Sequence, residues 1–286
     1  MAGQDEITSH YAIEGLLDRM LGSLGVSDRS PGSLPAASLR AVDEFHINGA
    51  EATERLIPEL RVAPGGRVLD LGSGVGGPAR HVAEATAAEV TGIELTPVFR
   101  DVAEALSVIA GLDGRTRFVL GSATELPFDA GSFDAAMLFH VGMNIADKAA
   151  VMAEAARVLR PGGRFVVYEV MRLGEGQPAF PVPWASGPGA SFLETPLTYR
   201  RLAEAAGFEV IALESRAEAA KAFFARMRAA LEAAKAEGRP QPPGLGSLLG
   251  AEAPAKIANM IAALADGVIA PVELILERAA TDPAPA

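Results

Sequence analysis

Hydrophobic residues along the chain fall into short apolar runs separated by longer stretches with helical spacing. From residue 67 to residue 278, strand-like runs such as 116–120 alternate with stretches such as 146–159, which have the spacing of helices. Alternation at these lengths is typical of right-handed βαβ units, in which helices cover both faces of a parallel sheet. The pattern predicts an α/β fold with a doubly wound, mostly parallel seven-stranded sheet, whose ligands lie at the carboxyl ends of the strands.

The same pattern predicts the order of the elements. Strands are expected at 68–71, 89–93, 116–120, 208–213 and 268–278, with two more ending near Phe139 and at Glu169; helices are expected at 7–24, 50–60, 78–86, 146–159 and 196–206. The last two strands are separated by an insertion of about fifty residues, and loops that long in compact domains usually have a function. The insertion is expected to contain a helix around 217–237, a Pro/Gly segment at 239–250 and a helix around 254–266.

We therefore predict an N-terminal helical cover at 1–62 and a ligand-binding core at 63–286. Within the core, segments at about 173–195 and 215–266 are expected to form a helical lid.

A glycine-rich segment, VLDLGSGVGG at residues 68–77, follows the first strand and opens the helix at 78–86. Glycines allow a tight turn and close approach of a ligand, and the helix start offers free N–H groups, so the segment predicts a nucleotide-type site. Gly72, Gly74 and Gly77 also satisfy the dinucleotide fingerprint, so nicotinamide and S-adenosylmethionine both remain open at this point. Glu94, about eighteen residues past Gly76, stands where a carboxylate binds a ribose in either kind of site.

Downstream segments favour S-adenosylmethionine. They are GSATELPF at 121–128, GSFD at 131–134 and RPGGR at 160–164. Together with the glycine-rich segment, this ordered series resembles the class I S-adenosylmethionine-dependent methyltransferases, with their Rossmann-like fold, over about residues 42–278. The segment HVGMNIADK at 140–148 is similar to the small-molecule branch that holds sarcosine/dimethylglycine, sugar O- and tocopherol or sterol methyltransferases.

The resemblance implies S-adenosyl-L-methionine as the cofactor and assigns residues to it. Asp70 is expected near the methionyl amine, Glu94 at the ribose and Ser122 near the adenine. Ser122 departs from the aspartate that relatives usually carry, and a serine hydroxyl is a shorter, neutral acceptor. The remaining cofactor-binding residues that the resemblance implies are Gly72, Ser73, Gly74, Gly76, Leu95, Ala123, Phe139, His46 and Tyr11. A tight turn for the glycines, a helix cap for Glu94 and core packing for Tyr11 are the alternatives.

His140 is the candidate catalytic residue, because the resemblance places the reacting methyl just beyond the fourth strand. An imidazole that titrates near neutrality can accept a proton from a hydroxyl nucleophile. Glu169, at the end of the fifth strand, is expected to orient His140 or to attract a cationic amine. The alternatives are a histidine that holds a loop and an acid that caps one.

His140, Trp184 and Phe192 are the candidate substrate residues. Aromatic side chains in a Pro/Gly-rich stretch commonly line an apolar pocket, although they also anchor loops. An apolar or mixed small-molecule acceptor is therefore expected. His10 and His81 are predicted to lie at the surface.

Composition limits the partners. At 286 residues and 49% hydrophobic content, the chain is expected to form one domain with a lid. The net charge of −11 and the pI near 4.9 argue against nucleic acid. The absence of cysteine excludes disulfides and thiolate chemistry. No signal peptide, membrane span or metal-ligand spacing is evident, so we expect a cytoplasmic protein with no membrane partner and no metal, whose oligomeric state the sequence leaves open.

The predicted function is methyl transfer from S-adenosylmethionine to an oxygen or nitrogen of a small molecule by direct displacement. One alternative is a nicotinamide-dependent oxidoreductase, which is weakened because none of Tyr11, Tyr168 and Tyr199 has a lysine four positions later. The other is a cofactor-binding protein without methyl transfer, which Ser122 leaves open.

Overall fold

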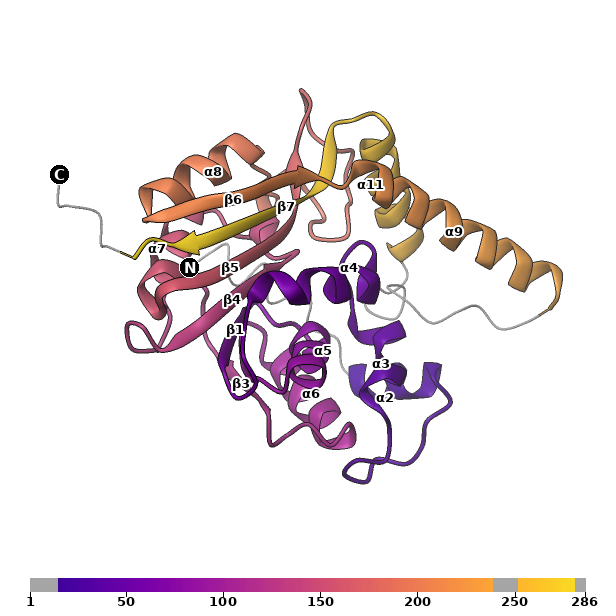
Figure 1. The fold of residues 1–286 in the computed structure, drawn as a ribbon. Coiled ribbons are helices and arrows are strands. Elements are labelled where there is room, and N and C mark those ends of the chain that lie inside the picture. Colours follow the sequence, from indigo (N-terminus) through magenta and orange to yellow (C-terminus); the bar gives the residue numbers. More distant parts are fainter. Residues whose placement is uncertain (1–14, 239–251, 281–286) are drawn as a thin grey trace.

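The computed structural model describes residues 15–238 and 252–280, and these residues form one sheet of seven strands in the order β3-β2-β1-β4-β5-β7-β6 (Figure 1). The strands are β1 (Arg67–Leu71), β2 (Glu89–Glu94), β3 (Thr116–Leu120), β4 (Phe133–Phe139), β5 (Leu159–Arg172), β6 (Phe208–Ser215) and β7 (Ile269–Arg278). β7 is antiparallel to β5 and β6, and the other neighbours are parallel. The predicted fold class is confirmed.

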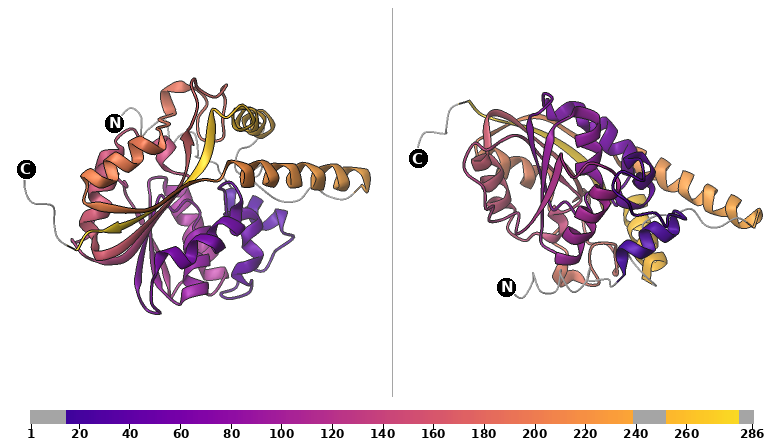
Figure 2. Two further views of the ribbon diagram at one scale, coloured as in Figure 1. Left: turned by 45° about the horizontal axis from the view of Figure 1, so that its top comes forward. Right: turned by 90° about the horizontal axis from the view of Figure 1, so that it is seen from below.

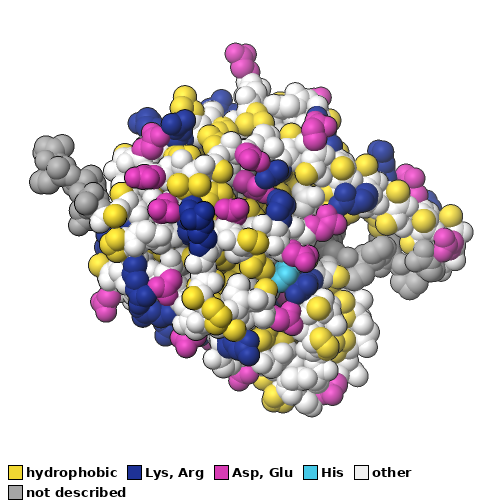
Figure 3. All heavy atoms as spheres, in the orientation of Figure 1, with side chains coloured by type: hydrophobic (Ala, Val, Ile, Leu, Met, Phe, Trp, Pro, Cys, Tyr) yellow, Lys and Arg dark blue, Asp and Glu magenta, His cyan; other side chains and the backbone are white. Residues whose placement is uncertain are grey.

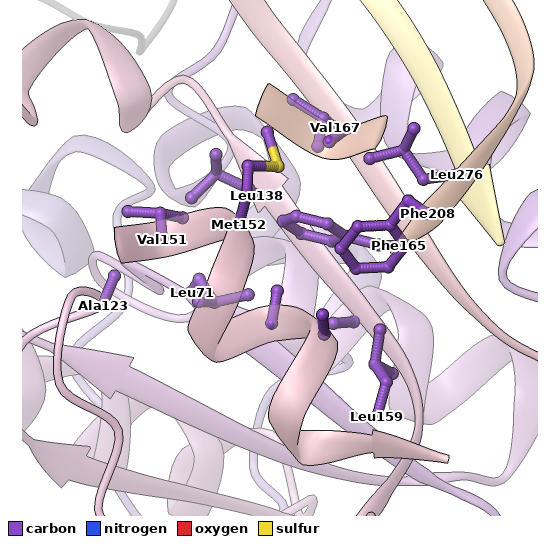
Figure 4. Close-up of a cluster of buried hydrophobic side chains, with 14 of the residues drawn as sticks. Leu71, Ala123, Leu138, Val151, Met152, Leu159, Phe165, Val167, Phe208 and Leu276 are labelled. Atoms are coloured by element: carbon purple, nitrogen blue, oxygen red, sulfur yellow. The ribbon is translucent and has the colours of Figure 1, made fainter. Parts of the chain in front are cut away.

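Helices cover both faces of the sheet (Figure 2). On one face, Met152 and Phe208 belong to a buried cluster that Figure 4 shows, and this cluster includes residues of α7 and α8. On the other face, Ala52 and Val82 belong to a second cluster, which includes residues of α4, α5 and α6. The bounds are α4 (Gly49–Leu56), α5 (Gly77–Thr86), α6 (Pro97–Ile109), α7 (Lys148–Val158) and α8 (Pro196–Ala205). Burial on both faces explains the nearly continuous apolar runs of the central strands.

Local sequence sets the starts of several helices. Asp147 accepts a hydrogen bond from the Ala150 amide at the start of α7, and Thr195 accepts one from the Thr198 amide at the start of α8. Such side-chain caps satisfy amides that have no partner inside the helix. α6 begins with Pro97, whose missing N–H costs nothing at a first helical position.

The described N-terminal part of the chain contains α2 (Leu16–Ser23), α3 (Ala36–Asp43) and a short 3₁₀ turn, η1 (Ile57–Leu60), after α4. Leu16 and Leu39 are buried against α6 residues such as Leu106. The first part of the helix expected at 7–24 lies outside the described residues. α3 is absent from the sequence prediction.

The insertion between β6 and β7 contains α9 (Ala217–Ala236) and α11 (Ala253–Ala265). α9 extends away from the body of the fold, with α11 beside its first part (Figure 1). The expected segment at 239–250 lies outside the described residues. Two 3₁₀ turns, η2 (Gly142–Asn144) and η3 (Pro188–Ala190), complete the elements. Among the residues described, no helix is long and apolar enough to cross a membrane.

Candidate cofactor and acceptor site

A cavity of about 1370 Å³ lies at the carboxyl ends of β1, β2 and β4 and reaches α9 and α11. Pockets for drug-sized ligands usually enclose about 300 to 1,000 Å³, so this cavity has room for more than one small ligand. Most of the residues predicted for the site line it: His46, Asp70, Gly72, Ser73, Gly74, Glu94, Leu95, Ser122, Ala123, Phe139, His140, Trp184 and Phe192. Gly76 and Glu169 are not among the lining residues, and Tyr11 lies outside the described part of the chain.

Two glycines of the loop after β1 are required for different reasons. Gly74 has a φ of +54°, and a Cβ added there would meet no atom within 4 Å, so this position faces open space in the cavity. Gly77 has an ordinary φ, but a Cβ there would lie 2.1 Å from the carbonyl oxygen of Asp43. Gly74 therefore leaves room at the site, whereas Gly77 allows the end of α3 to pack against the start of α5.

Glu94 ties two parts of the site together. Its carboxylate accepts the Gly74 amide at 2.8 Å and the Thr96 amide at 2.8 Å, so it links the loop after β1 to the start of α6. Burial raises the pKa of Glu94, and the two amides act in the opposite direction. The Thr96 hydroxyl and the Leu95 amide also lower this pKa, and the carboxylate oxygens face the cavity where ribose hydroxyls can reach them.

Asp70 and Ser73 present unsatisfied polar atoms at the end of β1. Asp70 Oδ2 and Ser73 Oγ are buried and have no hydrogen-bond partner among the described residues. Burial, followed by the nearby Glu94 and Glu44, raises the pKa of Asp70 well above its usual value. A buried polar atom without a partner costs about 1 to 3 kcal/mol, which a ligand ammonium or hydroxyl would remove. This donor set fits S-adenosylmethionine, with an ammonium at Asp70 and ribose hydroxyls at Glu94.

Ser122 lines the far edge of this region. Its hydroxyl lies 2.8 Å from Thr124 Oγ1 and accepts the Thr124 amide at 3.2 Å. The serine therefore stabilises its own turn, and its contact with the adenine stays a prediction.

His140 follows β4 in a left-handed conformation, with a φ of 54°. Nδ1 lies 3.1 Å from the carbonyl oxygen of Tyr168, which only accepts, so Nδ1 carries the proton. Nε2 then accepts the Ile47 amide at 3.4 Å. Burial, and next the nearby His46, lowers the pKa of His140 to about 3. This lowered pKa contradicts the expectation that the imidazole titrates near neutrality, and it does so for a half-buried residue that lines the cavity.

Glu169 does not line the cavity; it contacts the turn that follows His140. Its Oε1 accepts the Val141 amide at 2.7 Å and the Gly142 amide at 2.8 Å. The side chain is fully buried, and burial raises its pKa to about 7. The geometry makes Glu169 a positioning residue for the 141–144 turn, and it does not place the carboxyl against a substrate amine.

Two adjacent acidic residues at the end of α3 pair with two adjacent basic residues of α5. Asp43 Oδ2 lies 2.8 Å from Arg80 Nη2, and Glu44 Oε1 lies 3.0 Å from His81 Nδ1. Glu44 also accepts the Thr53 hydroxyl at 2.8 Å. We call Asp43, Glu44, Arg80 and His81 the α3–α5 clamp. The surface position predicted for His81 is wrong: its side chain is buried because it reaches Glu44.

His46 lies two residues after Glu44 of the clamp, and its Nδ1 is 3.7 Å from the Glu44 carboxylate. The His46 ring stacks edge-on against Phe139, with centroids 5.7 Å apart, and lies 5.8 Å from the His140 ring. Its Nε2 is 3.2 Å from Thr53 Oγ1, which donates its own proton to Glu44. His46 therefore donates to Thr53, and burial lowers its pKa. The ring shapes the cavity wall between the cofactor loops and His140.

Beyond His140 the cavity wall is apolar, with Met143, Trp184 and Phe192 among its residues. Trp184 Nε1 donates to Ser191 Oγ at 3.0 Å, and the Trp184 carbonyl accepts the side-chain amide of Asn144 at 2.7 Å. Both of the sequence-based readings of Trp184 are thus met, since it lines the cavity and holds its loop. Within the described residues, no group of three or more His, Asp or Glu side chains is arranged to hold a metal ion.

Residues 69–167 match the family described as methyltransferase domain. Methyltransferase GfsG of Streptomyces halstedii is 37% identical over 134 residues, which cover 47% of this chain and 48% of that protein. The 24-methylenesterol C-methyltransferase 2 of Oryza sativa subsp. japonica is 37% identical over 137 residues, which cover 48% of this chain and 36% of that enzyme. The chain thus spans less than half the length of these curated relatives.

Two solved structures share the fold. Geranyl diphosphate C-methyltransferase from Streptomyces coelicolor A3(2), solved with Mg²⁺, geranyl diphosphate and S-adenosyl-L-homocysteine, has a TM-score of 0.69 at 18% identity, covering 97% of this chain and 98% of the other. Phosphoethanolamine N-methyltransferase 2 of Haemonchus contortus, in complex with S-adenosyl-L-methionine, has a TM-score of 0.72 at 18% identity, covering 98% of this chain and 60% of the other.

The domain match defines the class of this region: residues 69–167 form a methyltransferase domain, and the whole chain shares the fold of two S-adenosylmethionine-dependent methyltransferases. S-adenosylmethionine is the cofactor of this family. The relatives do not favour the nicotinamide-dependent alternative, and they confirm the family resemblance predicted from the sequence.

Proposed function

We propose that the protein transfers a methyl group from S-adenosylmethionine to an oxygen or nitrogen atom of a small-molecule acceptor. One observation carries the proposal: a single cavity joins Gly74 and Glu94 to an apolar chamber beneath α9 and α11, and His140 lines the same cavity. S-adenosylmethionine supplies an electrophilic methyl group, and the protein's own part is to bind, orient and exclude water.

Each polar residue of the site has a role in this proposal. Asp70 binds the methionyl ammonium, Glu94 binds the ribose and Ser122 lies at the adenine. His140 is neutral and offers the Nε2 lone pair that it shares with the Ile47 amide, so it orients an acceptor hydroxyl as a hydrogen-bond acceptor. Glu169 holds the amides of the turn that follows His140.

A second candidate is transfer to an alkene carbon of the acceptor. A histidine with a pKa of about 3 is a weak base, and an alkene needs no deprotonation before it attacks. The new C–C bond would form as the C–S bond breaks and S-adenosylhomocysteine leaves, and the carbocation would then lose a proton to water. The rice relative is named a C-methyltransferase. Nuclear magnetic resonance of the product made with a ¹³C-labelled methyl donor separates the candidates, because methoxy, N-methyl and C-methyl carbons resonate in different regions.

Calorimetry with S-adenosylmethionine and with NAD is the first test. We expect saturable binding of S-adenosylmethionine and none of NAD, with Asp70→Asn as a variant of nearly equal size that weakens binding. A screen of acceptors, read out by release of S-adenosylhomocysteine, then tests transfer. Binding without release of S-adenosylhomocysteine for any acceptor would support a cofactor-binding protein instead.

The proposal includes no nucleic-acid or membrane partner, no metal and a cytoplasmic location. The net charge of −11 supports the first point, because phosphate binding requires clustered cations. On the face shown in Figure 3, Lys and Arg side chains are interspersed with Asp and Glu. Fractionation of the cell that makes the protein tests the location.

A further inference from the structure

The acceptor end of the cavity is built from three segments of the chain. These are the segment 183–192 around η3, α9 and α11, which contribute mainly aromatic and aliphatic side chains. The residues are Pro183, Trp184, Phe192, Phe223, Phe224, Met227, Ile257, Met260 and Ile261. Several of them belong to one buried hydrophobic cluster that joins α9 and α11 to the sheet. A ligand body in this chamber exchanges water for apolar contacts, which favours apolar groups.

Cations that would bind an anionic acceptor are scarce at this end. Among the described residues that line the cavity, Arg40 and Arg228 are the only arginines and no lysine occurs. Arg40 pairs with Glu84 at 2.8 Å, and Arg228 is exposed on α9. His46 and His140 add no charge, because burial lowers the pKa of both. An acceptor with a phosphate or carboxylate would lose its hydration at this end without gaining a buried partner.

Buried carboxylates that would bind a cationic acceptor are also lacking among the described residues at this end. Glu51 pairs with Arg226 at 2.7 Å, and Asp147 caps α7 through the Ala150 amide at 2.9 Å. The unpartnered oxygen of Asp70 lies at the end of β1, where the cofactor binds. Glu169 is not a lining residue of the cavity. Glu51 and Asp147 are both exposed, so among the described residues neither offers a buried carboxylate to an ammonium at the acceptor end.

We propose that the acceptor is an uncharged, predominantly apolar molecule, whose body lies between α9, α11 and Trp184 while its reacting atom lies beside His140. The proposal rests on the proposed function, since it names the substrate class of the same site. It separates this protein from enzymes that hold a phosphorylated or zwitterionic acceptor with buried cations.

Trp184 provides a direct readout. It is the only tryptophan of the chain, it lines the acceptor end, and only 2% of its surface is exposed. Three probes with the same chain, decan-1-ol, decyl phosphate and decylamine, are titrated below their micelle concentrations into the full chain saturated with S-adenosylhomocysteine. We expect the alcohol to shift Trp184 emission with a half-saturation concentration at least ten times lower than those of the two charged probes. Equal or tighter binding of either charged probe would overturn the proposal.

Variants locate the binding. Met227→Glu on α9 and Ile261→Glu on α11 place a charge on the chamber wall, and each is expected to weaken decan-1-ol binding at least tenfold. Ile211→Glu, on the 47% exposed position of β6 outside the cavity, is the matched control and should bind like the wild type. Unchanged binding by both chamber variants would place the alcohol elsewhere and reject the chamber.

The comparison of probes on the wild-type chain does not depend on the folding of any variant. S-adenosylmethionine binding, measured separately by calorimetry, distinguishes the two proposals. If the wild type does not bind S-adenosylmethionine, the proposed function is rejected. If it binds S-adenosylmethionine but prefers a charged probe, only the acceptor class is rejected.

Discussion

Alanine at Gly74 and at Gly77 tests the structure most directly, because the two glycines lie three positions apart and serve different purposes. At Gly74, an alanine must adopt the left-handed conformation, which costs about 1 to 2 kcal/mol. Its methyl group meets no protein atom within 4 Å and points into open space at the site. We expect Gly74→Ala to lower the free energy of unfolding by about 1 to 2 kcal/mol, and to weaken S-adenosylmethionine binding by roughly 100-fold, or about 3 kcal/mol.

At Gly77 we expect a larger loss of stability than at Gly74 and a smaller loss of cofactor affinity. The methyl group would lie 2.1 Å from the Asp43 carbonyl oxygen, so the end of α3 must retreat. Overpacking of this kind costs about 1 to 3 kcal/mol, and a backbone oxygen yields less easily than a side chain, so we expect a loss of about 3 kcal/mol. Cofactor affinity of the folded variant should fall less than in Gly74→Ala.

Urea denaturation followed by circular dichroism gives the free energy of unfolding, and calorimetry gives the cofactor affinity. Wild-type affinity in a folded Gly74→Ala protein would refute the placement of the cofactor against this loop. Wild-type stability of Gly77→Ala would refute the close contact between α3 and α5.

Three further substitutions test the polar residues of the site. Glu94→Gln keeps one acceptor but turns an NH₂ group toward the other amide. The free energy of unfolding without cofactor should therefore fall by about 1.5 to 3 kcal/mol, and an unchanged urea midpoint would contradict this. His140→Ala should lower turnover by about 100-fold with cofactor affinity intact. Because the pKa of His140 is about 3, its titration should add no step to the wild-type rate between about pH 5 and 9. A step near pH 6.5 that the variant loses would contradict this. Glu169 has a pKa of about 7 in the folded protein, above its ordinary value of 4.5. Between these two values the folded state binds more protons than the unfolded state, so the contribution of Glu169 to stability falls as the pH rises to about 7. Glu169→Gln should reduce the loss of stability between pH 5 and 8 measured by urea denaturation, and an unchanged difference would count against the buried carboxyl.

The regular part of the fold could be predicted because its signals are local. The run 116–120 has the bounds of β3, and the helix expected at 217–237 differs from α9 by one residue at its end. Period and length suffice for such elements. α3 was missed because it is short and because its main polar contacts are with Arg80 and His81, distant in sequence.

The environments and pKa values of single side chains were harder to predict from the sequence. The surface position predicted for His81 failed because its partner, Glu44, lies 37 positions earlier. His140 was placed next to the site, but its pKa depends on burial and on the nearby His46, neither of which the motif encodes. The glycine motif likewise cannot distinguish Gly74, which faces the cavity, from Gly77, which accommodates Asp43.

The connection between β6 and β7 has a consequence for how such a protein can diversify. Ser215, the last residue of β6, is paired with Val272 of β7, so the chain leaves the sheet and returns to it at neighbouring points. The excursion carries α9 and α11, whereas the glycine loop and Glu94 belong to β1, β2 and α5 at the opposite half of the sheet. Exchange of the connection after Arg216, whose amide donates to the Pro271 carbonyl, would thus leave the pairing of β1, β2 and β4 in place. New acceptors can therefore be acquired largely by changes in this connection, while Trp184 and Phe192 supply the rest of the acceptor wall and the donor half stays as it is.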